Sequence, residues 1–309
     1  MNASSEVEGV FFCSGARNHL LLQQLQHFPL YMEIDERIAS FKALGLGKSR
    51  KKLAVVCTTS GTAVSECLSA MIEAFYSEVP FLLISADRPL KLRDSGAPQT
   101  LDHELITRGF RRDYRDLDLE EFINLDFSTL KHPAHVNVRI TTLDEMDSDV
   151  SVSNTPNFES FLSAVKNPLF LFSHEISDMR EFVEKFIPTG LPFYAEVSSG
   201  AKDLSVIKTE RELLALFNRG IFDGVVRIDH TPLSKLWRML EGKKTPVYSF
   251  DSRGLRGLSY GSVEKISVGE LINHEPFWNS LPPPRYEVKD ESPFILNNLL
   301  CYKLSLIHI

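Results

Sequence analysis

Patterns of cysteine and histidine that mark disulfide frameworks or metal sites are missing from this 309-residue sequence. The chain has only four cysteines, which form neither a CxxC pair nor a zinc-ligand spacing: Cys13, Cys57, Cys67 and Cys301. Because Cys13 and Cys57 lie in apolar runs typical of strands, we expect buried, reduced thiols. The nine histidines include no HxH or HxxxH pair, so we predict no metal site and note only His103, which closely follows Gln99.

Long apolar runs and an excess of basic residues are also missing. The run from residue 79 to 86 ends at Asp87, far short of the roughly 18 apolar residues that a membrane span needs. Residues 1–6 (MNASSE) lack the basic and apolar regions of a secretory signal, so we expect a cytoplasmic protein. Lys and Arg number 34 against 41 Asp and Glu, and the net charge of −7 argues against a nucleic-acid partner.

Length and composition predict two globular domains. Hydrophobic residues make up 43% and charged residues 24% of the chain, which is ordinary for a folded protein. At roughly 150 residues per domain, the length suggests two domains. A polar segment at 147–158 (DSDVSVSNTPNF) is typical of a linker, so we predict domains at 1–146 and 159–275, followed by an irregular tail at 276–309.

Both domains alternate apolar runs with amphipathic segments, which predicts open α/β domains with parallel sheets. Strands are expected in the first domain at 10–13, 53–57, 81–85 and 135–138, and in the second at 169–172, 192–195, 224–228 and 246–249. Helices are expected at 36–48, 60–76 and 117–130, then at 176–186, 209–218 and 233–240.

Four loops of the first domain carry polar residues where α/β proteins bind ligands, just after strands. They are 14–18 (SGARN), 35–37 (DER), 58–63 (TTSGTA), and 86–89 (ADRP) followed by 96–100 (GAPQT). Each alone has a simple structural explanation. Glu36 can be an acid that suits a helix N-terminus, Ser60 or Thr62 can cap a helix, and an arginine can form a surface ion pair.

In their order and spacing these loops resemble a known family. The segments DERxxxFxALGLGK, CTTSGTAVSECLSAMIEA and PFLLISADRPLxLRDSGAPQT follow an early GAR, as in the 2-succinyl-5-enolpyruvyl-6-hydroxy-3-cyclohexene-1-carboxylate synthase family of menaquinone biosynthesis. The resemblance is close over residues 9–140 and thinner in the second domain, where 227–235 (RIDHTPLSK) is similar to a family segment that ends in a lysine. It implies a pyrimidine-binding domain followed by a central domain of a thiamine-diphosphate enzyme.

The resemblance also implies a reaction and its site residues. Such an enzyme is a transferase that decarboxylates 2-oxoglutarate and adds the product to isochorismate, using thiamine diphosphate and Mg²⁺. Glu36 takes the position of the carboxylate at the cofactor's pyrimidine N1′, with Ser60 or Thr62 nearby. The substrate carboxylates are expected to meet Arg17, Arg88, Gln99 and Lys235, although for Lys235 a plain surface charge is an equal alternative.

The chain departs from the family pattern in three places. The family's diphosphate domain, with Gly-Asp-Gly and a downstream Asn that hold magnesium, has no counterpart, since the segment 222–224 (FDG) precedes a strand of the second domain. The segment before the first strand is short, and Ala16 and Pro98 stand where serine and asparagine are frequent. We therefore expect the chain to lack activity alone and to need a separate diphosphate-domain chain, or to be a truncated form of a homodimeric or homotetrameric enzyme.

Other functions remain as alternatives. The chain could be a non-catalytic module that pairs with a full-length synthase, or another thiamine-diphosphate carboligase. The ADRP and GAxQT segments argue against the second of these. A nicotinamide enzyme is disfavoured because no GxGxxG follows a strand.

Overall fold

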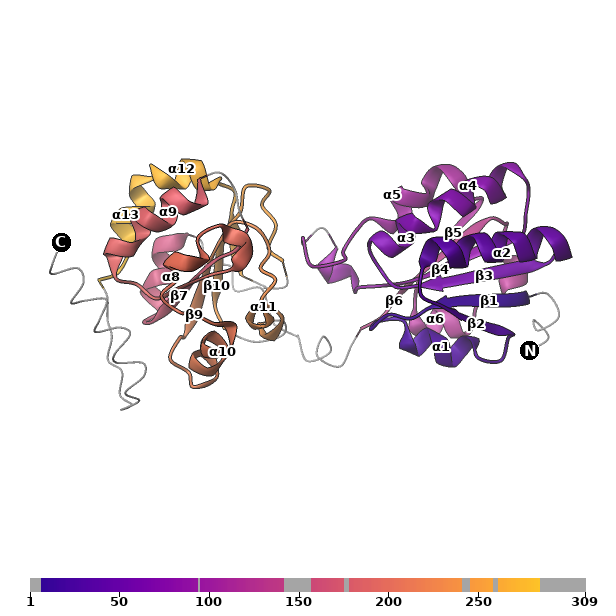
Figure 1. Ribbon diagram of the computed structural model, residues 1–309, viewed down its shortest axis with the longest axis horizontal. Helices are drawn as coiled ribbons and strands as arrows, with labels where there is room; N and C mark the ends of the chain where they lie inside the picture. The colour runs from indigo at the N-terminus through magenta and orange to yellow at the C-terminus, as the bar shows by residue number, and fades with distance from the viewer. Residues whose placement is uncertain are drawn as a thin grey trace. The chain divides into compact units, whose positions relative to one another are not determined.

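Two compact units, Met1–Leu143 and Asp144–Ile309, make up the chain, and each is built on one parallel sheet (Figure 1). The computed structural model describes residues 7–93, 95–141, 157–174, 178–240, 245–257 and 261–283. The prediction of two open parallel-sheet α/β domains is confirmed. Most of the predicted linker and tail lies outside the described residues. Within the described ranges, no helix combines the length and apolar character needed to cross a bilayer.

The first sheet has the strand order β2-β1-β3-β4-β6-β5 in the described residues, with every pair parallel. The strands are β1 (Val7–Cys13), β2 (Leu30–Glu33), β3 (Leu53–Thr58), β4 (Phe81–Asp87), β5 (Asp113–Asp118) and β6 (Ala134–Arg139). Every residue of β3 and β4 is buried. Continuous burial on both faces explains why these strands read as unbroken apolar runs.

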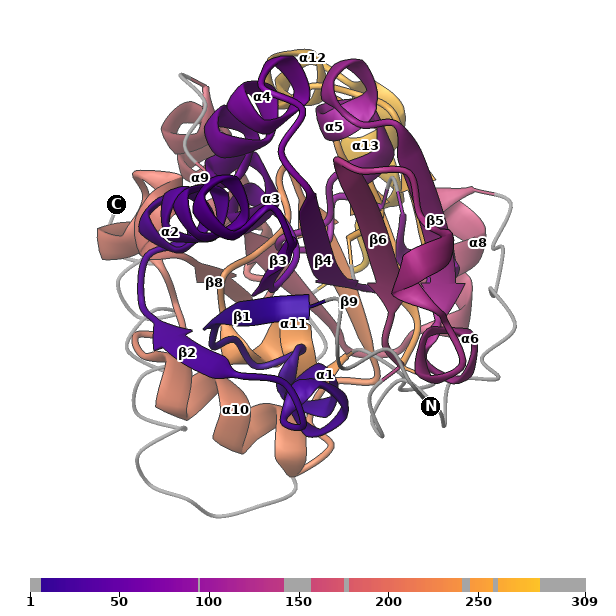
Figure 2. The same ribbon diagram turned by 90° about the vertical axis from the view of Figure 1, so that its right-hand side faces the viewer.

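Helices cover both faces of the first sheet (Figure 2). They are α1 (His19–Leu25), α2 (Glu36–Arg50), α3 (Thr62–Glu66), α4 (Leu68–Tyr76), α5 (His103–Thr107) and α6 (Leu119–Ile123), with short 3₁₀ turns η2 (Leu90–Leu92), η3 (Arg108–Phe110) and η4 (Phe127–Thr129). Alternate residues of β1 serve the two layers, because strand side chains alternate in direction. Phe11 packs with α2, α3 and α4, whereas Phe12 packs with α1 and α6.

The second unit has a sheet of order β11-β10-β9-β7-β8 in its described part. The strands are β7 (Pro168–Phe172), β8 (Phe193–Ala195), β9 (Gly224–Ile228), β10 (Val247–Phe250) and β11 (Ser262–Glu264). The helices are α8 (Phe158–Ala164), α9 (Met179–Phe186), α10 (Glu210–Asn218), α11 (Lys235–Met239), α12 (Val268–Ile272) and α13 (Glu275–Ser280), with turns η5 (Ile187–Thr189), η6 (Val197–Ser199) and η7 (Lys202–Leu204).

Aromatic residues dominate the core of this unit. Phe158 of α8 and Phe277 of α13 lie in one cluster with Phe172 and Phe182, so packing of the second unit begins by residue 158 and continues past residue 275. Arg227, which alternates with the cluster residues Val226 and Ile228 along β9, faces Trp237 of α11 on the other side of the sheet.

Several predicted elements were wrong in extent or type. The expected helix at 60–76 is two helices, which meet at Cys67. Most of the expected helix at 117–130 is not one, since β5 continues to Asp118 and α6 ends at Ile123. The strands β2, β5 and β11 were not predicted. All three lie at the edges of their sheets, where partial exposure removes the continuous apolar run that marks a buried strand.

Candidate functional site at the carboxyl edge of the first sheet

The predicted loops of the first unit meet at one edge of its sheet. The chain leaves β1 to form β2 on one side and β3 on the other, so the strand order reverses between β1 and β3. Ligands of open α/β proteins bind outside the carboxyl ends of the strands at such a reversal. A Cβ atom added to Gly15, after β1, would lie 2.7 Å from Cβ of Thr59, after β3, so these two loops are in direct contact.

Glu36 lies at this position and does not cap its helix. The carboxylate of Asp35 accepts the Ile38 backbone N–H at 2.9 Å and serves as the N-cap of α2. One oxygen of the partly exposed Glu36 carboxylate accepts the Thr58 hydroxyl at 3.4 Å. Within the described residues its other oxygen makes no hydrogen bond, so the carboxylate can still accept one from a ligand.

Arg17 is held across the sheet edge. Its Nη1 donates to the backbone oxygen of Ile140, just after β6, at 2.6 Å. The buried Asn18 stabilises the same loop, because its side chain accepts the Gly15 N–H and donates to the Cys13 backbone oxygen, both at 2.8 Å. The sequence showed no role for Asn18, although a buried asparagine after a strand commonly ties a turn to the backbone.

The turn at residues 58–62 places Ser60 and Thr62 on either side of Gly61. Gly61 is the N-cap of α3, its φ is +81°, and no side chain caps this helix. Capping by Ser60 or Thr62, the alternative that the sequence left open, is therefore wrong. Ser60 is buried and Thr62 is exposed.

Gln99 lies directly against this turn. A Cβ atom on Gly61 would come within 2.9 Å of the Gln99 Cβ and 3.0 Å of its Cα, so only a glycine leaves room for the Gln99 backbone. Gln99 itself has φ of +59°. Arg88 secures the same loop, since its Nε donates to the Pro98 backbone oxygen at 3.0 Å. The structure thus brings together five loops that carry Arg17, Glu36, Ser60, Thr62, Arg88 and Gln99.

Lys235 lies in the second unit, at the first position of α11. Its side chain is exposed, and its backbone N–H donates to the Glu210 carboxylate. The preceding loop is held by Glu196, which accepts the backbone N–H groups of Leu233 at 3.0 Å and Ser234 at 2.7 Å. Burial raises the pKa of Glu196, while these hydrogen bonds oppose the shift.

The thiols near the site are buried and reduced, as predicted for Cys13 and Cys57. Cys13, Cys57 and Cys67 are free thiols, whereas Cys301 lies outside the described residues. Burial, reinforced by the charge of Glu36, raises the pKa of Cys13 to about 12. A thiol with this pKa is protonated at neutral pH and is a poor nucleophile.

Sequence reasoning missed a buried polar network behind the site. It crosses three paired strands, where Ser85 of β4 faces Asn137 of β6 and Asn137 faces Asp116 of β5. His135 and His103 join it. The signal was present in the sequence at 134–138 (AHVNV), where two polar residues alternate with the apolar residues of a predicted strand.

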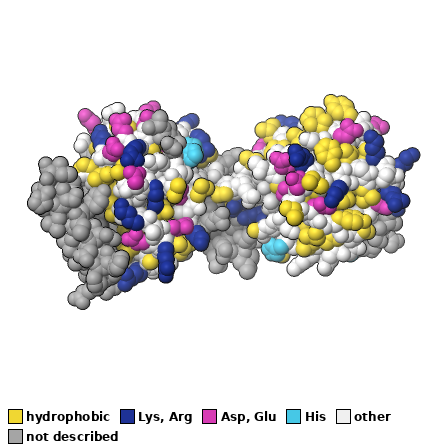
Figure 3. Space-filling model, viewed as in Figure 1, with side chains coloured by type: hydrophobic (Ala, Val, Ile, Leu, Met, Phe, Trp, Pro, Cys, Tyr) yellow, Lys and Arg dark blue, Asp and Glu magenta, His cyan; other side chains and the backbone are white. Residues whose placement is uncertain are grey.

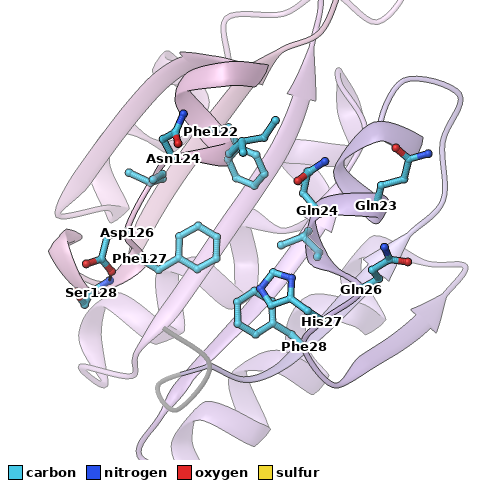
Figure 4. Close-up of a pocket in the computed structure, with 13 residues that line it drawn as sticks. Gln23, Gln24, Gln26, His27, Phe28, Phe122, Asn124, Asp126, Phe127 and Ser128 are labelled. Atoms are coloured by element: carbon cyan, nitrogen blue, oxygen red, sulfur yellow. Dashed lines mark hydrogen bonds between the residues drawn. The ribbon is translucent and has the colours of Figure 1, made fainter. Parts of the chain in front are cut away.

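A separate cavity of about 590 Å³ lies on the α1 and α6 side of the first unit (Figure 4). Phe28 and Phe127, whose rings stack 6.2 Å apart, and Phe122 give it an apolar lining, and Gln23, Gln24, Gln26, His27 and Asn124 add polar groups. None of the predicted site residues lines this cavity. Among the residues that the structure describes, no three His, Cys, Asp or Glu side chains gather as a metal site.

The comparisons with known proteins agree with this geometry. Residues 2–106, which carry all four loop motifs, match the family described as thiamine pyrophosphate enzyme, N-terminal TPP binding domain. Over these residues the chain is similar to that family's amino-terminal domain. Thiamine pyrophosphate is another name for thiamine diphosphate, so the family description agrees with the cofactor that the sequence predicted.

Curated relatives confirm the resemblance seen in the motifs. Proteins named 2-succinyl-5-enolpyruvyl-6-hydroxy-3-cyclohexene-1-carboxylate synthase include one from Bdellovibrio bacteriovorus, 32% identical over 307 residues, which covers 88% of this chain and 57% of the relative. A relative from Akkermansia muciniphila is 28% identical over 286 residues, covering 85% and 54%. One from Corynebacterium diphtheriae is 39% identical over 137 residues, covering 43% and 26%. The chain spans just over half the length of the Bdellovibrio relative.

Proposed function

We propose that this chain supplies the pyrimidine-binding part of a thiamine-diphosphate enzyme that decarboxylates 2-oxoglutarate and adds the product to isochorismate. The name that the relatives carry supports this reaction. The observation that carries the proposal is the position of Glu36 at the reversal of strand order, with its capping role taken by Asp35. The cytoplasmic location expected from the sequence stays a prediction.

The described residues fit one part of the cofactor. Glu36 offers a partly exposed carboxylate at the carboxyl edge of the sheet, which suits a ring nitrogen that carries a proton. Thiamine diphosphate, when bound, supplies the carbanion chemistry that the side chains cannot perform. We propose that Mg²⁺ and the diphosphate are held by a domain beyond these residues, either in a separate chain or in a longer form of this one.

The chain's own residues would then bind and orient. Glu36 holds the proton at the pyrimidine N1′, with Ser60 and Thr62 beside it. Arg17 and Arg88 offer guanidinium groups to substrate carboxylates, which two parallel hydrogen bonds can fix in one orientation. Gln99 adds a neutral amide, and a substrate-binding role for Lys235, with a plain surface charge as the equal alternative, stays a prediction. Both arginines also bond to backbone oxygens, which limits their motion before substrate arrives.

Exposed apolar side chains near Glu36 support the need for a partner chain. Ile34 is 100% exposed, and Met32, Ile38 and Phe41 are about half exposed. Arg37, Ile38, Phe41 and Lys42 line a shallow cavity of about 410 Å³ on α2. Figure 3 shows hydrophobic side chains on the face of the first unit that carries α2 and α4. Apolar surface of this kind marks interaction sites, so we propose that the diphosphate-domain chain or a second subunit covers it.

Complementation tests this function. The chain is mixed with a separately produced carboxyl-terminal part of the Bdellovibrio relative, with thiamine diphosphate, Mg²⁺ and both substrates. We expect product only from the mixture. Glu36→Gln keeps the shape and removes the charge, so it should lower kcat by about 10²-fold or more.

Glu33→Gln is the matched control, because Glu33 lies at the end of β2 and its carboxylate is already paired with Lys42 at 2.6 Å. Equal activity of the two variants would remove Glu36 from its role. Stable pairing of the two chains without turnover would favour the non-catalytic interaction module instead. Turnover with a different 2-oxo acid would favour another carboligase.

A further inference from the structure

His103 is a buried residue that connects the loop after β3 to strand β6. It begins α5, and only 2% of its surface is exposed. Its Nε2 accepts the Gly61 backbone N–H at 2.9 Å. Its Nδ1 lies 2.8 Å from the Asn137 side-chain oxygen. His103 therefore touches the turn between Ser60 and Thr62, while the chain runs back from it to Gln99 in four residues.

The orientation of Asn137 decides which nitrogen of His103 carries the proton. The Asn137 amide nitrogen donates to Asp87 at 2.9 Å and to Asp116 at 3.1 Å. Partial burial raises the pKa of Asp116, but the hydrogen bonds and charge of Arg93 outweigh it and leave this pKa below its usual value. Because the amide nitrogen donates to these two carboxylates, the amide oxygen faces His103, and His103 must donate to it from Nδ1.

The other half of the network agrees with this assignment. The Ser85 hydroxyl donates to the same Asn137 oxygen at 2.8 Å, so it accepts from His135 Nε2 at 2.8 Å. Burial keeps the pKa of His135 well below its usual value, and the ring is neutral. Its Nδ1 then accepts the Thr107 hydroxyl at 2.9 Å. The Thr107 hydroxyl also lies 3.1 Å from the His103 backbone oxygen, so these two acceptors share its single proton. Nε2 of His103 keeps the lone pair that the Gly61 N–H requires.

We propose that His103 is a positioning residue of this site. As the neutral imidazole protonated at Nδ1, it fixes the Gly61 turn against the Gln99 loop, and Asn137 fixes the ring. Gly61 has no Cβ, and Gln99 lies in the space that a Cβ would fill, so the two loops have little room to shift. The buried ring contacts no substrate. Its effect on catalysis rests on the proposed function, whereas its tautomer and its bond to Gly61 do not.

Nitrogen NMR of the isotopically labelled full chain tests the structural part. We expect the His103 ring to show a protonated Nδ1 and an unprotonated Nε2, with a coupling across the hydrogen bond to the Gly61 amide nitrogen. A proton on Nε2 would overturn the proposal, because two donors would then face each other. This measurement needs neither cofactor nor partner, so it stands even if the enzyme assignment fails.

Two variants test the positioning role. In His103→Gln the side-chain amide oxygen can replace Nε2 as the acceptor of the Gly61 N–H. In His103→Leu the side chain has no acceptor, so this hydrogen bond is lost. We expect hydrogen exchange of the Gly61 amide to rise by about tenfold or more in the Leu variant and to stay near wild type in the Gln variant.

In the complemented enzyme, the Leu variant should lose kcat by about 10- to 100-fold, since small misplacements of site loops have effects of this size. The Gln variant should restore most of that loss. Two results would contradict this role of His103. In the first, hydrogen exchange of the Gly61 amide stays at the wild-type rate in both variants. In the second, both variants lose kcat equally, although the Gly61 amide stays protected in the Gln variant.

Discussion

At the scale of single residues, Arg227 is the bulkiest fully buried charged side chain in the described part of the second unit. It lies 3.2 Å from the Asp251 carboxylate, donates to the Ser249 hydroxyl oxygen at 3.0 Å, and lies 5.4 Å from the centre of the Trp237 ring. Burial lowers the pKa of Arg227 to about 10, although Asp251 opposes the shift. Arg227 is therefore charged at neutral pH, and the structure depends on its partner remaining in place.

Replacing Arg227 should be costly because Asp251 would keep a buried charge with its main partner gone. We expect Arg227→Met to lower the free energy of unfolding by about 3–5 kcal/mol. Arg253 provides the control, since its half-exposed guanidinium lies 3.8 Å from the same carboxylate. Arg253→Met should change this free energy by no more than about 0.5 kcal/mol.

Urea unfolding followed by tryptophan fluorescence measures this difference. Both tryptophans, Trp237 and Trp278, lie in the second unit. Adding Asp251→Asn to Arg227→Met should recover part of the loss, because the unpaired charge is then gone. Equal effects of the two arginine variants would show that burial does not set the strength of the pair.

At the scale of elements, α2 has the most complete end signals of the first unit. Asp35 caps its start and Glu36 lies in the first turn, while Lys48 and Arg50 lie in the last turn. These charges complement the helix dipole. At the other end, Lys51 adopts a left-handed conformation and its N–H bonds to the Gly47 oxygen at 2.9 Å. These signals explain why the predicted start, residue 36, agrees with the structure.

Removing the cap should loosen the start of α2 and so the position of Glu36. We expect Asp35→Ala to cost about 1 kcal/mol, because the Ile38 N–H loses its acceptor. Asp35→Asn keeps an acceptor oxygen and should cost clearly less. Urea unfolding followed by circular dichroism gives the free energies, and hydrogen exchange at Ile38 locates the effect. Equal losses in the Ala and Asn variants would mean that the hydrogen bond is not the source.

At the scale of the whole molecule, ionised carboxylates contribute to stability in both units. Hydrogen bonds from neighbouring groups lower the pKa values of exposed carboxyls, namely Asp126 by Ser128, Asp203 by Arg180 and Glu270 by Ser267. Asp116 is the most buried carboxylate whose pKa is lowered, with Arg93 bonded to both its oxygens at 2.7 and 2.9 Å. Glu196, whose pKa burial raises, acts in the opposite direction.

These shifts predict that acid destabilises the protein. A carboxyl with a lowered folded-state pKa stabilises the fold above its unfolded pKa, and this contribution disappears as the pH falls through the folded value. For Asp116 the loss begins near the ordinary aspartate value of 3.8 and continues below it. We expect the free energy of unfolding of wild type to fall more steeply below about pH 4 than that of Asp116→Asn.

Urea unfolding at a series of pH values provides the measurement, with Asp113→Asn as the control. Asp113 pairs with Arg115 at 3.2 Å, and that arginine is half exposed, so solvent screens the pair. The control should keep the wild-type pH profile. An unchanged profile for Asp116→Asn would mean that the Arg93 pair does not govern the acid response.

The amino-acid sequence by itself determined the buried strands, the α/β class and the four loops of the candidate site. These features follow from local patterns. Strands buried on both faces are continuous apolar runs, and in a parallel sheet the loops that follow them must share one edge. Glu36, Arg88 and Gln99 were selected as candidate site residues from the family resemblance that these motifs carry together, and their roles stay predictions.

Only the tertiary structure decided which distant groups meet. Gly61 and His103 are 42 residues apart, and Ser85 and Asn137 are 52 apart, so no local pattern links them. The edge strand β5 could not be recognised either, because its polar sequence acquires strand geometry only by pairing with β6. Such contacts depend on chain packing and sheet register, which bring together residues that the sequence keeps far apart.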